Sequence, residues 1–97
     1  MLPIQFTLFQ NYPNPFNSAT IIKYALPAGE HQVKLIIYDL MGHQIRTLVN
    51  NENQQAGVYQ ISWEGRDDDG NVVASGVYFY RLQAGNQFFI KKIVLLE

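Results

Sequence analysis

The fold is constrained most by a series of short apolar runs, separated about every ten residues by turn-forming residues. Within a run, apolar side chains recur at every second position, as at Ile22, Tyr24 and Leu26. This period places them on one face of a β-strand, and no long stretch of the chain shows the spacing of a helix. The pattern therefore predicts short strands joined by hairpins.

Turn chemistry predicts two hairpins. Asp39 and Gly42 suit the first and fourth positions of a type I turn, because the Asp carboxylate can accept from a nearby backbone N–H and Gly tolerates a positive φ. This turn lies within a predicted hairpin over residues 33–49. Gly85-Asn86 suits a two-residue type II′ turn between the last two strands. The second of these strands is predicted to run to the last residue, although the final residues of most domains fray.

Two other segments are predicted to interrupt the strands. Pro27, Ala28 and Gly29 are expected to end the strand over residues 20–26, and the polar residues 50–55 are expected to form a loop. A strand with clean alternation follows this loop, and a turn with Asp-Gly at its tip comes next. The whole chain is predicted to hold about seven strands.

These strands predict the fold class. The chain of 97 residues is expected to be a single domain over residues 1–97, with residues 1–5 as a linker or an added start. About seven strands in this length, around a single Trp, predict an all-β, immunoglobulin-like antiparallel β-sandwich. The chain has no Cys, so the sandwich is expected to lack a disulfide.

The tripeptide Gly-Val-Tyr occurs twice, at residues 57–59 and 76–78. We interpret both copies as the start of a strand that follows a turn, built in the same way, and not as an array of repeats. Immunoglobulin-like sandwiches often contain a tyrosine corner, in which a Tyr hydroxyl bonds back to the preceding backbone. Tyr78 or Tyr80 is expected to supply this hydroxyl.

Composition excludes several classes of protein. Hydrophobic residues make up 47% and charged residues 15%, which is typical of a globular domain and not of a disordered chain. A net charge of -1 provides no field that would attract nucleic acid or an anionic membrane. No apolar run reaches the length of about 18 residues that a membrane-spanning helix needs, and the start does not resemble a signal peptide. Neither nucleic-acid binding nor membrane insertion is expected.

Catalytic, metal and cofactor sites are not expected. No nucleophile, base and acid converge in the predicted hairpins, and no phosphate-binding Gly-rich loop is present. Asp67 and Asp69 are weak candidates for a Ca²⁺ site, but the acidic residue that would complete a calcium loop is missing, which favours a solvated turn. His31 and His43 lie next to turns without the spacing of a zinc site. The chain is expected to be neither an enzyme nor a binder of a cofactor.

Six motifs occur in order along the chain. They are Phe6-Thr7-Leu8-Phe9-Gln10-Asn11-Tyr12-Pro13-Asn14-Pro15-Phe16-Asn17, Thr20-x-Ile22-x-Tyr24-x-Leu26-Pro27, Ile37-Tyr38-Asp39-x-x-Gly42, Gly57-x-Tyr59-x-Ile61-x-Trp63-x-Gly65, Ala74-Ser75-Gly76-Val77-Tyr78 and Lys92-Ile93-Val94-Leu95-Leu96. With these motifs nearly the whole chain resembles the type A C-terminal sorting domain of the type IX secretion system (Por secretion system). Two positions depart from the family pattern: Ser18 stands where Pro is frequent, and Glu97 stands where Lys or Arg is common.

The resemblance implies that the domain is a signal that sorts a protein for secretion. Such domains end larger secreted proteins of Bacteroidetes-like bacteria, whose precursors reach the periplasm by a signal peptide. The outer-membrane translocon then recognises the folded domain, and a surface sorting peptidase commonly removes it. The resemblance thus implies a preceding passenger domain and a secreted or cell-surface product. The residues that would form the scaffold are Asp39, Gly42, Gly57, Tyr59, Trp63, Gly76 and Tyr78.

The residues expected to be recognised lie near both ends of the chain. They are Pro13, Asn14, Pro15 and Phe16, and Lys92, Ile93, Val94, Leu95 and Leu96. The first group can equally be a rigid lead-in over an open end of the sandwich, and the isomers of its prolines stay open. The second group can equally be an edge strand of the sheet. If exposed, this edge would bind a partner by strand addition, whereas Lys91 and Lys92 can simply protect it from aggregation.

Two other hypotheses remain. In the first, the chain is an accessory module of a secreted enzyme and binds a carbohydrate or a protein. Tyr38, Phe79, Phe88 and Phe89 are expected to face outward, and a flat patch of three of them would favour this function. In the second, the chain is the immunoglobulin-like domain of a flagellar hook-capping protein, which shares the Gly-x-Tyr and Trp-x-Gly motifs. The Pro-Asn-Pro-Phe opening and the terminal strand argue against it.

Overall fold

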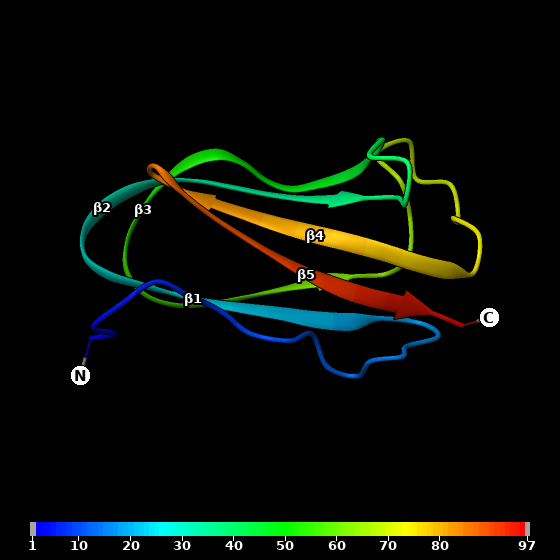
Figure 1. Cartoon of the computed structure of the whole chain (residues 1–97), viewed down its shortest axis with the longest axis horizontal. Coiled ribbons are helices and arrows are strands. Elements are labelled where there is room, and N and C mark those ends of the chain that lie inside the picture. The colour runs from blue at the N-terminus through cyan, green and yellow to red at the C-terminus, as the bar shows by residue number, and fades with distance from the viewer. Residues whose placement is uncertain (1, 97) are drawn as a thin grey trace.

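The computed structural model describes residues 2–96, which form an antiparallel all-β fold (Figure 1). The strands are β1 (Thr7–Leu8), β2 (Thr20–Tyr38), β3 (Gln44–Trp63), β4 (Gly76–Ala84) and β5 (Gln87–Leu95). The all-β class predicted from the sequence is confirmed. Met1 and the acidic Glu97 lie outside the described residues. Residues 2–96 contain no helix with the length and apolarity needed to cross a membrane.

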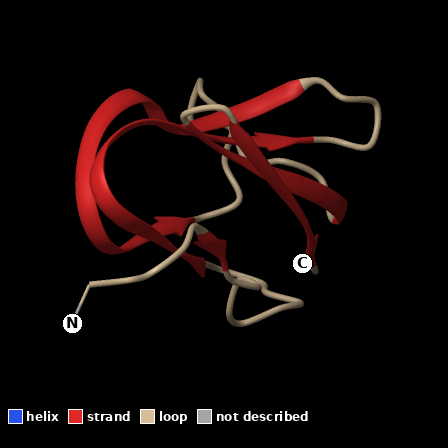
Figure 2. Ribbon diagram, turned by 60° about the vertical axis from the view of Figure 1, so that its left-hand side comes forward, coloured by secondary structure: helices blue, strands red, loops and turns tan. Residues whose placement is uncertain are grey.

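β2 and β3 are long strands that belong to both layers of a sandwich. They pair with each other from Thr20 opposite Trp63 to Tyr38 opposite Gln44, and this ribbon curls over at one end of the molecule (Figures 1 and 2). The start of β2, the end of β3 and β1 form one layer, and the end of β2, the start of β3, β4 and β5 form the other. β2 and β3 each contribute a strand segment to both layers, and β1, β4 and β5 contribute one each. This agrees with the prediction of about seven strands.

The curled part of this ribbon shows that two predictions were wrong. Pro27, Ala28 and Gly29 do not end the strand but lie within β2, where the register of the ladder shifts. Pro has no N–H and Gly29 has a φ of +109°, so the ladder is irregular here and the strand bends without ending. The predicted loop over residues 50–55 belongs to β3. Its polar side chains are mostly exposed on both faces of the ribbon, so no alternation marks it as a strand.

The core lies between the two layers and contains alternate residues of each strand. Its fully buried members include Ile22, Tyr24, Leu26, Val33, Leu35, Ile37, Tyr80, Leu82, Ile93 and Leu95. Trp63 is also buried, and its ring centroid lies 5.5 Å from that of Phe16 and 5.6 Å from that of Tyr78. The strand phase predicted around Ile22 is therefore confirmed.

The two predicted hairpin turns are confirmed. The Asp39 Oδ1 atom accepts from the N–H groups of Met41 and His43, each at 2.9 Å, and Gly42 has a φ of +86°. Chiefly through the His43 N–H, this arrangement holds the pKa of the Asp39 carboxyl below its usual value. Gly85 has a φ of +61° while the φ of the following Asn is not positive, which is the pattern of a type II′ turn.

The two Gly-Val-Tyr segments do begin their strands in the same way. The Tyr59 hydroxyl donates to the Gln55 carbonyl, and the Tyr78 hydroxyl donates to the Ala74 carbonyl, each at 2.6 Å. Each bond reaches back four residues, and the glycine of each tripeptide has a positive φ, of 154° or 150°. Tyr78, and not Tyr80, therefore forms the tyrosine corner.

Candidate recognition site

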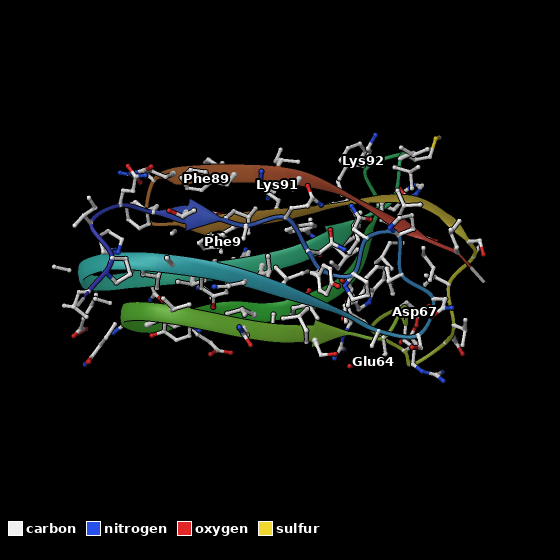
Figure 3. The ribbon with its side chains drawn as sticks, turned by 90° about the horizontal axis from the view of Figure 1, so that it is seen from below. Phe9, Glu64, Asp67, Phe89, Lys91 and Lys92 are labelled. Carbon is white, nitrogen blue, oxygen red and sulfur yellow. The ribbon has the colours of Figure 1, made fainter. Side chains whose placement is uncertain are left out.

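The two segments predicted to be recognised lie side by side. Phe16 forms a parallel bridge with Leu95. The Phe16 N–H donates to the Val94 carbonyl at 2.9 Å, and the Leu96 N–H donates to the Phe16 carbonyl at 2.8 Å. β1 pairs with β2 in one layer. After β1, the chain crosses to the opposite layer, where Phe16 joins the end of β5 (Figure 3). Residues separated by most of the chain therefore build one site.

Two side chains extend this pairing along the outer edge of β5. The Asn14 Oδ1 atom accepts from the Val94 N–H at 2.9 Å, and the Gln10 Nε2 group donates to the Lys92 carbonyl at 2.7 Å. Together with Phe16, these groups occupy the edge between Lys92 and Leu96. The hypothesis that this stretch binds a partner by strand addition is wrong, because a partner would first have to displace residues 10–16.

Both X-Pro bonds of the motif are cis, at Tyr12-Pro13 and at Asn14-Pro15. The sequence left these isomers open. Over these residues the chain passes from the ladder with β2, where Tyr12 bridges Ile21, to the bridge with β5. The prediction of a rigid lead-in over one end of the sandwich and the prediction of a recognition segment thus describe the same residues.

Phe16 anchors the motif in the core. Its side chain is 2% exposed and packs against Trp63, whose Nε1–H donates to the Arg66 carbonyl at 2.8 Å. Gly65, two residues after Trp63, makes room for the Leu95 side chain. A Cβ atom at Gly65 would lie only 3.3 Å from the Leu95 side chain, and the φ of +69° also favours glycine. Sequence reasoning did not predict this second role of the Trp-x-Gly motif.

A buried polar cluster holds the segment before the prolines. The Tyr80 hydroxyl accepts from the Asn11 N–H at 2.8 Å and donates to the Phe9 carbonyl at 2.7 Å. The Asn11 Nδ2 group donates to the Thr20 Oγ1 atom at 2.9 Å, and the Thr20 hydroxyl donates to the Pro13 carbonyl at 2.8 Å. Burial raises the pKa of Tyr80 to about 12. Sequence reasoning missed this cluster, although a Thr at a core-facing strand position was a signal.

Only some of the predicted recognition residues can be touched from outside. Phe16, Ile93 and Leu95 are buried and act as anchors, and Val94 is half-buried. Lys92 is exposed, and its side chain lies on the outer face of β4 and β5, opposite Phe79 in the ladder (Figure 3). Three of the accessible residues, Pro13, Pro15 and Leu96, line a shallow hollow, whereas the exposed Asn14 is not part of its lining. We call this hollow the terminal surface and define it by Pro13, Pro15, Asn17, Ser18 and Leu96.

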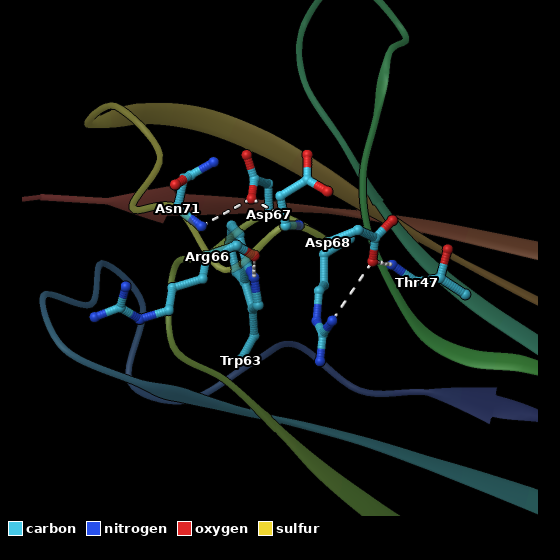
Figure 4. A network of polar contacts seen from close by, with 8 residues as sticks. Thr47, Trp63, Arg66, Asp67, Asp68 and Asn71 are labelled. Atoms are coloured by element: carbon cyan, nitrogen blue, oxygen red, sulfur yellow. Dashed lines mark hydrogen bonds and ion pairs between the residues drawn. The ribbon is translucent and has the colours of Figure 1, made fainter.

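The acidic turn over residues 67–71 uses its oxygens for backbone bonds. The Asp67 Oδ1 atom accepts from the N–H groups of Asp69 and Asn71, at 3.0 and 2.9 Å (Figure 4). The Asp68 Oδ1 atom accepts from the Thr47 N–H at 2.9 Å, which ties the turn to β3. Among residues 2–96, no group of three or more His, Cys, Asp or Glu side chains is placed to hold a metal ion. The arrangement serves to build a turn.

The four aromatic residues predicted to face outward do not all do so. Phe89 packs against the core. Tyr38, Phe79 and Phe88 lie on the outer face of the layer formed by β2, β4 and β5. The guanidinium carbon of Arg81 lies over two of their rings, 5.2 Å from the Tyr38 centroid and 5.3 Å from the Phe88 centroid. The face is therefore aromatic and cationic.

Comparisons with known proteins support the fold assignment. A family model described as FlgD Ig-like domain matches residues 14–87. This match confirms the prediction of an immunoglobulin-like antiparallel β-sandwich. No curated protein matches the chain significantly.

Two solved structures from Porphyromonas gingivalis share the fold. Dimeric latent PorU aligns with 99% of this chain, with a TM-score of 0.74 and 19% sequence identity. PorZ, described as an essential bacterial surface component of the type-IX secretion system, aligns with 93%, with a TM-score of 0.62 and 23% identity. The aligned part covers 10% of the PorU chain and 11% of the PorZ chain, so this chain spans about a tenth of either.

Proposed function

The chain belongs to the FlgD Ig-like domain family, and we propose that within this family it is a non-catalytic sorting domain. In this role it directs a larger passenger protein across the outer membrane by the type IX secretion system. The family model matches residues 14–87 and leaves out Tyr12, Pro13 and nearly all of β5. The sorting hypothesis depends most on these unmatched parts, and family membership is compatible both with it and with the hook-capping hypothesis.

One observation carries the proposal: the Pro-Asn-Pro-Phe motif and the terminal strand form a single unit. Phe16 and Asn14 bond to the backbone of residues 94–96, and the terminal surface lies over that junction. Such a surface exists only when both segments are folded together. It suits a receptor that must distinguish a folded domain from an unfolded chain. The likeness in fold to PorU and PorZ of Porphyromonas gingivalis supports the same assignment.

The proposal assigns partners and a location. The first partner is the outer-membrane translocon, which recognises the terminal surface. The second is a surface sorting peptidase, which cleaves the domain from the passenger that precedes it in the precursor. The passenger is carried from the periplasm to the cell surface or is released. The domain itself performs no chemistry.

Export of a reporter tests this function. A periplasm-directed reporter is fused in front of the intact chain, or in front of a chain that lacks residues 92–97, in a bacterium with a type IX system. We expect reporter on the surface only with the intact chain. Reporter held in the periplasm by an intact domain that is shown to be folded would contradict the proposal.

The outer face of β2, β4 and β5 supports a second candidate function, that of an accessory binding module of a secreted enzyme. Three aromatic residues gather there around Arg81, namely Tyr38, Phe79 and Phe88. Saturable binding to a polysaccharide, lost in Phe79→Ala or Phe88→Ala, would favour this function over sorting.

A further inference from the structure

Within the described residues 2–96, Arg81 is held in place without a charged partner. Its guanidinium lies over the rings of Tyr38 and Phe88, and these two contacts restrict its motion. Neither of the two ion pairs found among residues 2–96 involves Arg81, and no side-chain hydrogen bond among these residues uses it. A positioned guanidinium of this kind is ready to bind a carboxylate through two parallel hydrogen bonds.

The surroundings of Arg81 add positive charge. On this face Lys92 lies directly opposite Phe79 in the ladder. Ile36 lies opposite Arg81, and Lys34 is two positions away from Ile36 along β2. The outward positions of β2, β4 and β5 that share this face carry no acidic residue. Asp39 borders the face, but its carboxylate already accepts bonds within its own turn. The face is thus cationic on a chain whose net charge is -1.

An apolar hollow lies directly beside this guanidinium. Tyr38, Leu40, Phe79 and Ile90 line it together with Arg81, and the turn residues Asp39 and Gly42 complete its lining. Leu40 is 66% exposed and Ile90 is 62% exposed, so these aliphatic side chains are presented to solvent. Apolar groups that are exposed in a cluster next to a fixed charge are typical of a binding surface.

We propose that this face binds an extended peptide segment of a partner protein, in which a carboxylate stands next to an apolar side chain. Arg81 takes the carboxylate, and the hollow beside Leu40 and Ile90 takes the apolar group. A carbohydrate fits less well, because Arg81 covers one face of the Tyr38 and Phe88 rings on which a sugar would stack. The face lies apart from the terminal surface, so the inference holds whether or not the domain is a sorting signal.

Titration of the isotope-labelled, intact chain, followed by NMR, tests this inference. The probes are the peptide acetyl-Leu-Glu-Leu-Glu-Leu-amide, the same peptide with Gln in place of Glu, and an oligogalacturonate as an acidic carbohydrate. We expect the Glu peptide to shift the signals of Phe79, Arg81 and Ile90. Binding should weaken about tenfold for the Gln peptide, because a charge-assisted bond is lost.

Variants identify the role of Arg81. Arg81→Gln should weaken binding of the Glu peptide about tenfold, and Arg81→Lys should also weaken it, because Lys keeps the charge but not the planar pair of donors. Arg66→Gln, on a turn whose residues do not line the hollow, is the matched control and should bind like the unchanged chain. Any one of four results would overturn the inference. These are equal binding of both peptides, shifts confined to another surface, binding of oligogalacturonate alone, and no binding of either peptide at about 1 mM.

Discussion

Asn14 completes the outer edge of the last strand, because its side-chain oxygen accepts a hydrogen bond from the Val94 N–H at 2.9 Å. The two residues lie 80 positions apart in the chain. The bond stands where a neighbouring strand would otherwise pair, and Phe16 continues the pairing through the Val94 carbonyl and the Leu96 N–H. A short polar side chain between two prolines thus has a defined structural task in addition to any contact with a receptor.

The substitution Asn14→Ala should loosen the end of β5. Loss of one hydrogen bond at an exposed edge is expected to cost about 0.5–1.5 kcal/mol of the free energy of unfolding. The local sign should be faster amide hydrogen exchange at Val94, measured by NMR, while the centre of β4 stays protected. Asn17→Ala, at an exposed position, serves as the control. Unchanged exchange at Val94 would show that the bond does not hold the edge.

The substitution Tyr80→Phe should release the segment before the prolines. The hydroxyl both accepts from the Asn11 N–H and donates to the Phe9 carbonyl, so its removal leaves buried polar groups without a partner. We expect a loss of about 1–3 kcal/mol, measured by urea denaturation. Tyr59→Phe removes a hydroxyl at a more exposed position and should cost less. Equal losses in both variants would contradict the importance of this cluster.

Stability should fall at alkaline pH. Burial raises the pKa of both Tyr24 and Tyr80 from 10.0 to about 12 in the folded chain. Because the folded state holds these protons more tightly than the unfolded state, their contribution is complete below about pH 10 and is lost as the pH rises toward 12. Denaturation curves measured across this range should show the loss, and it should be smaller in the double variant Tyr24→Phe, Tyr80→Phe. The exposed Tyr12→Phe is the control.

The substitution Trp63→Ala should remove the centre of one end of the core. The ring is 1% exposed and contacts both Phe16 and Tyr78. The expected loss is about 3–5 kcal/mol, which can unfold a domain of this size. Val58→Ala, at a position that is 57% exposed, should change the free energy of unfolding little. A loss below about 1 kcal/mol for Trp63→Ala would contradict the packing described here.

Alternation and turn chemistry were enough to predict most of the fold. The phase of Ile22, Tyr24 and Leu26 and the turn at Asp39 and Gly42 depend on local rules, and the structure follows them. The bend within β2 could not be predicted in this way. Its residues are exposed on both faces, so a strand leaves no alternating signal there, and Pro27 looks like a stop.

The site was predicted in part. The sequence singled out the Pro-Asn-Pro-Phe motif and the last strand, but no local rule says that two segments so far apart are bonded to each other. Likewise, no spacing rule connects Asn11 with Tyr80 or gives Gly65 its place against Leu95. These relationships depend on which strand the segment after β1 joins, and that is decided by packing of the whole sandwich.

Export of a reporter with substitutions on the terminal surface tests the central claim most directly. The change Leu96→Asp alters a side chain that is 54% exposed, and Leu2→Asp is a matched control at a leucine that is 57% exposed. Both variants should fold, which circular dichroism and urea denaturation can verify. We predict that the reporter fused to the Leu96→Asp chain stays in the periplasm, while the reporter fused to the Leu2→Asp chain reaches the surface like that of the unchanged chain. Equal export of a folded Leu96→Asp chain and the unchanged chain would contradict the claim that the translocon recognises the terminal surface.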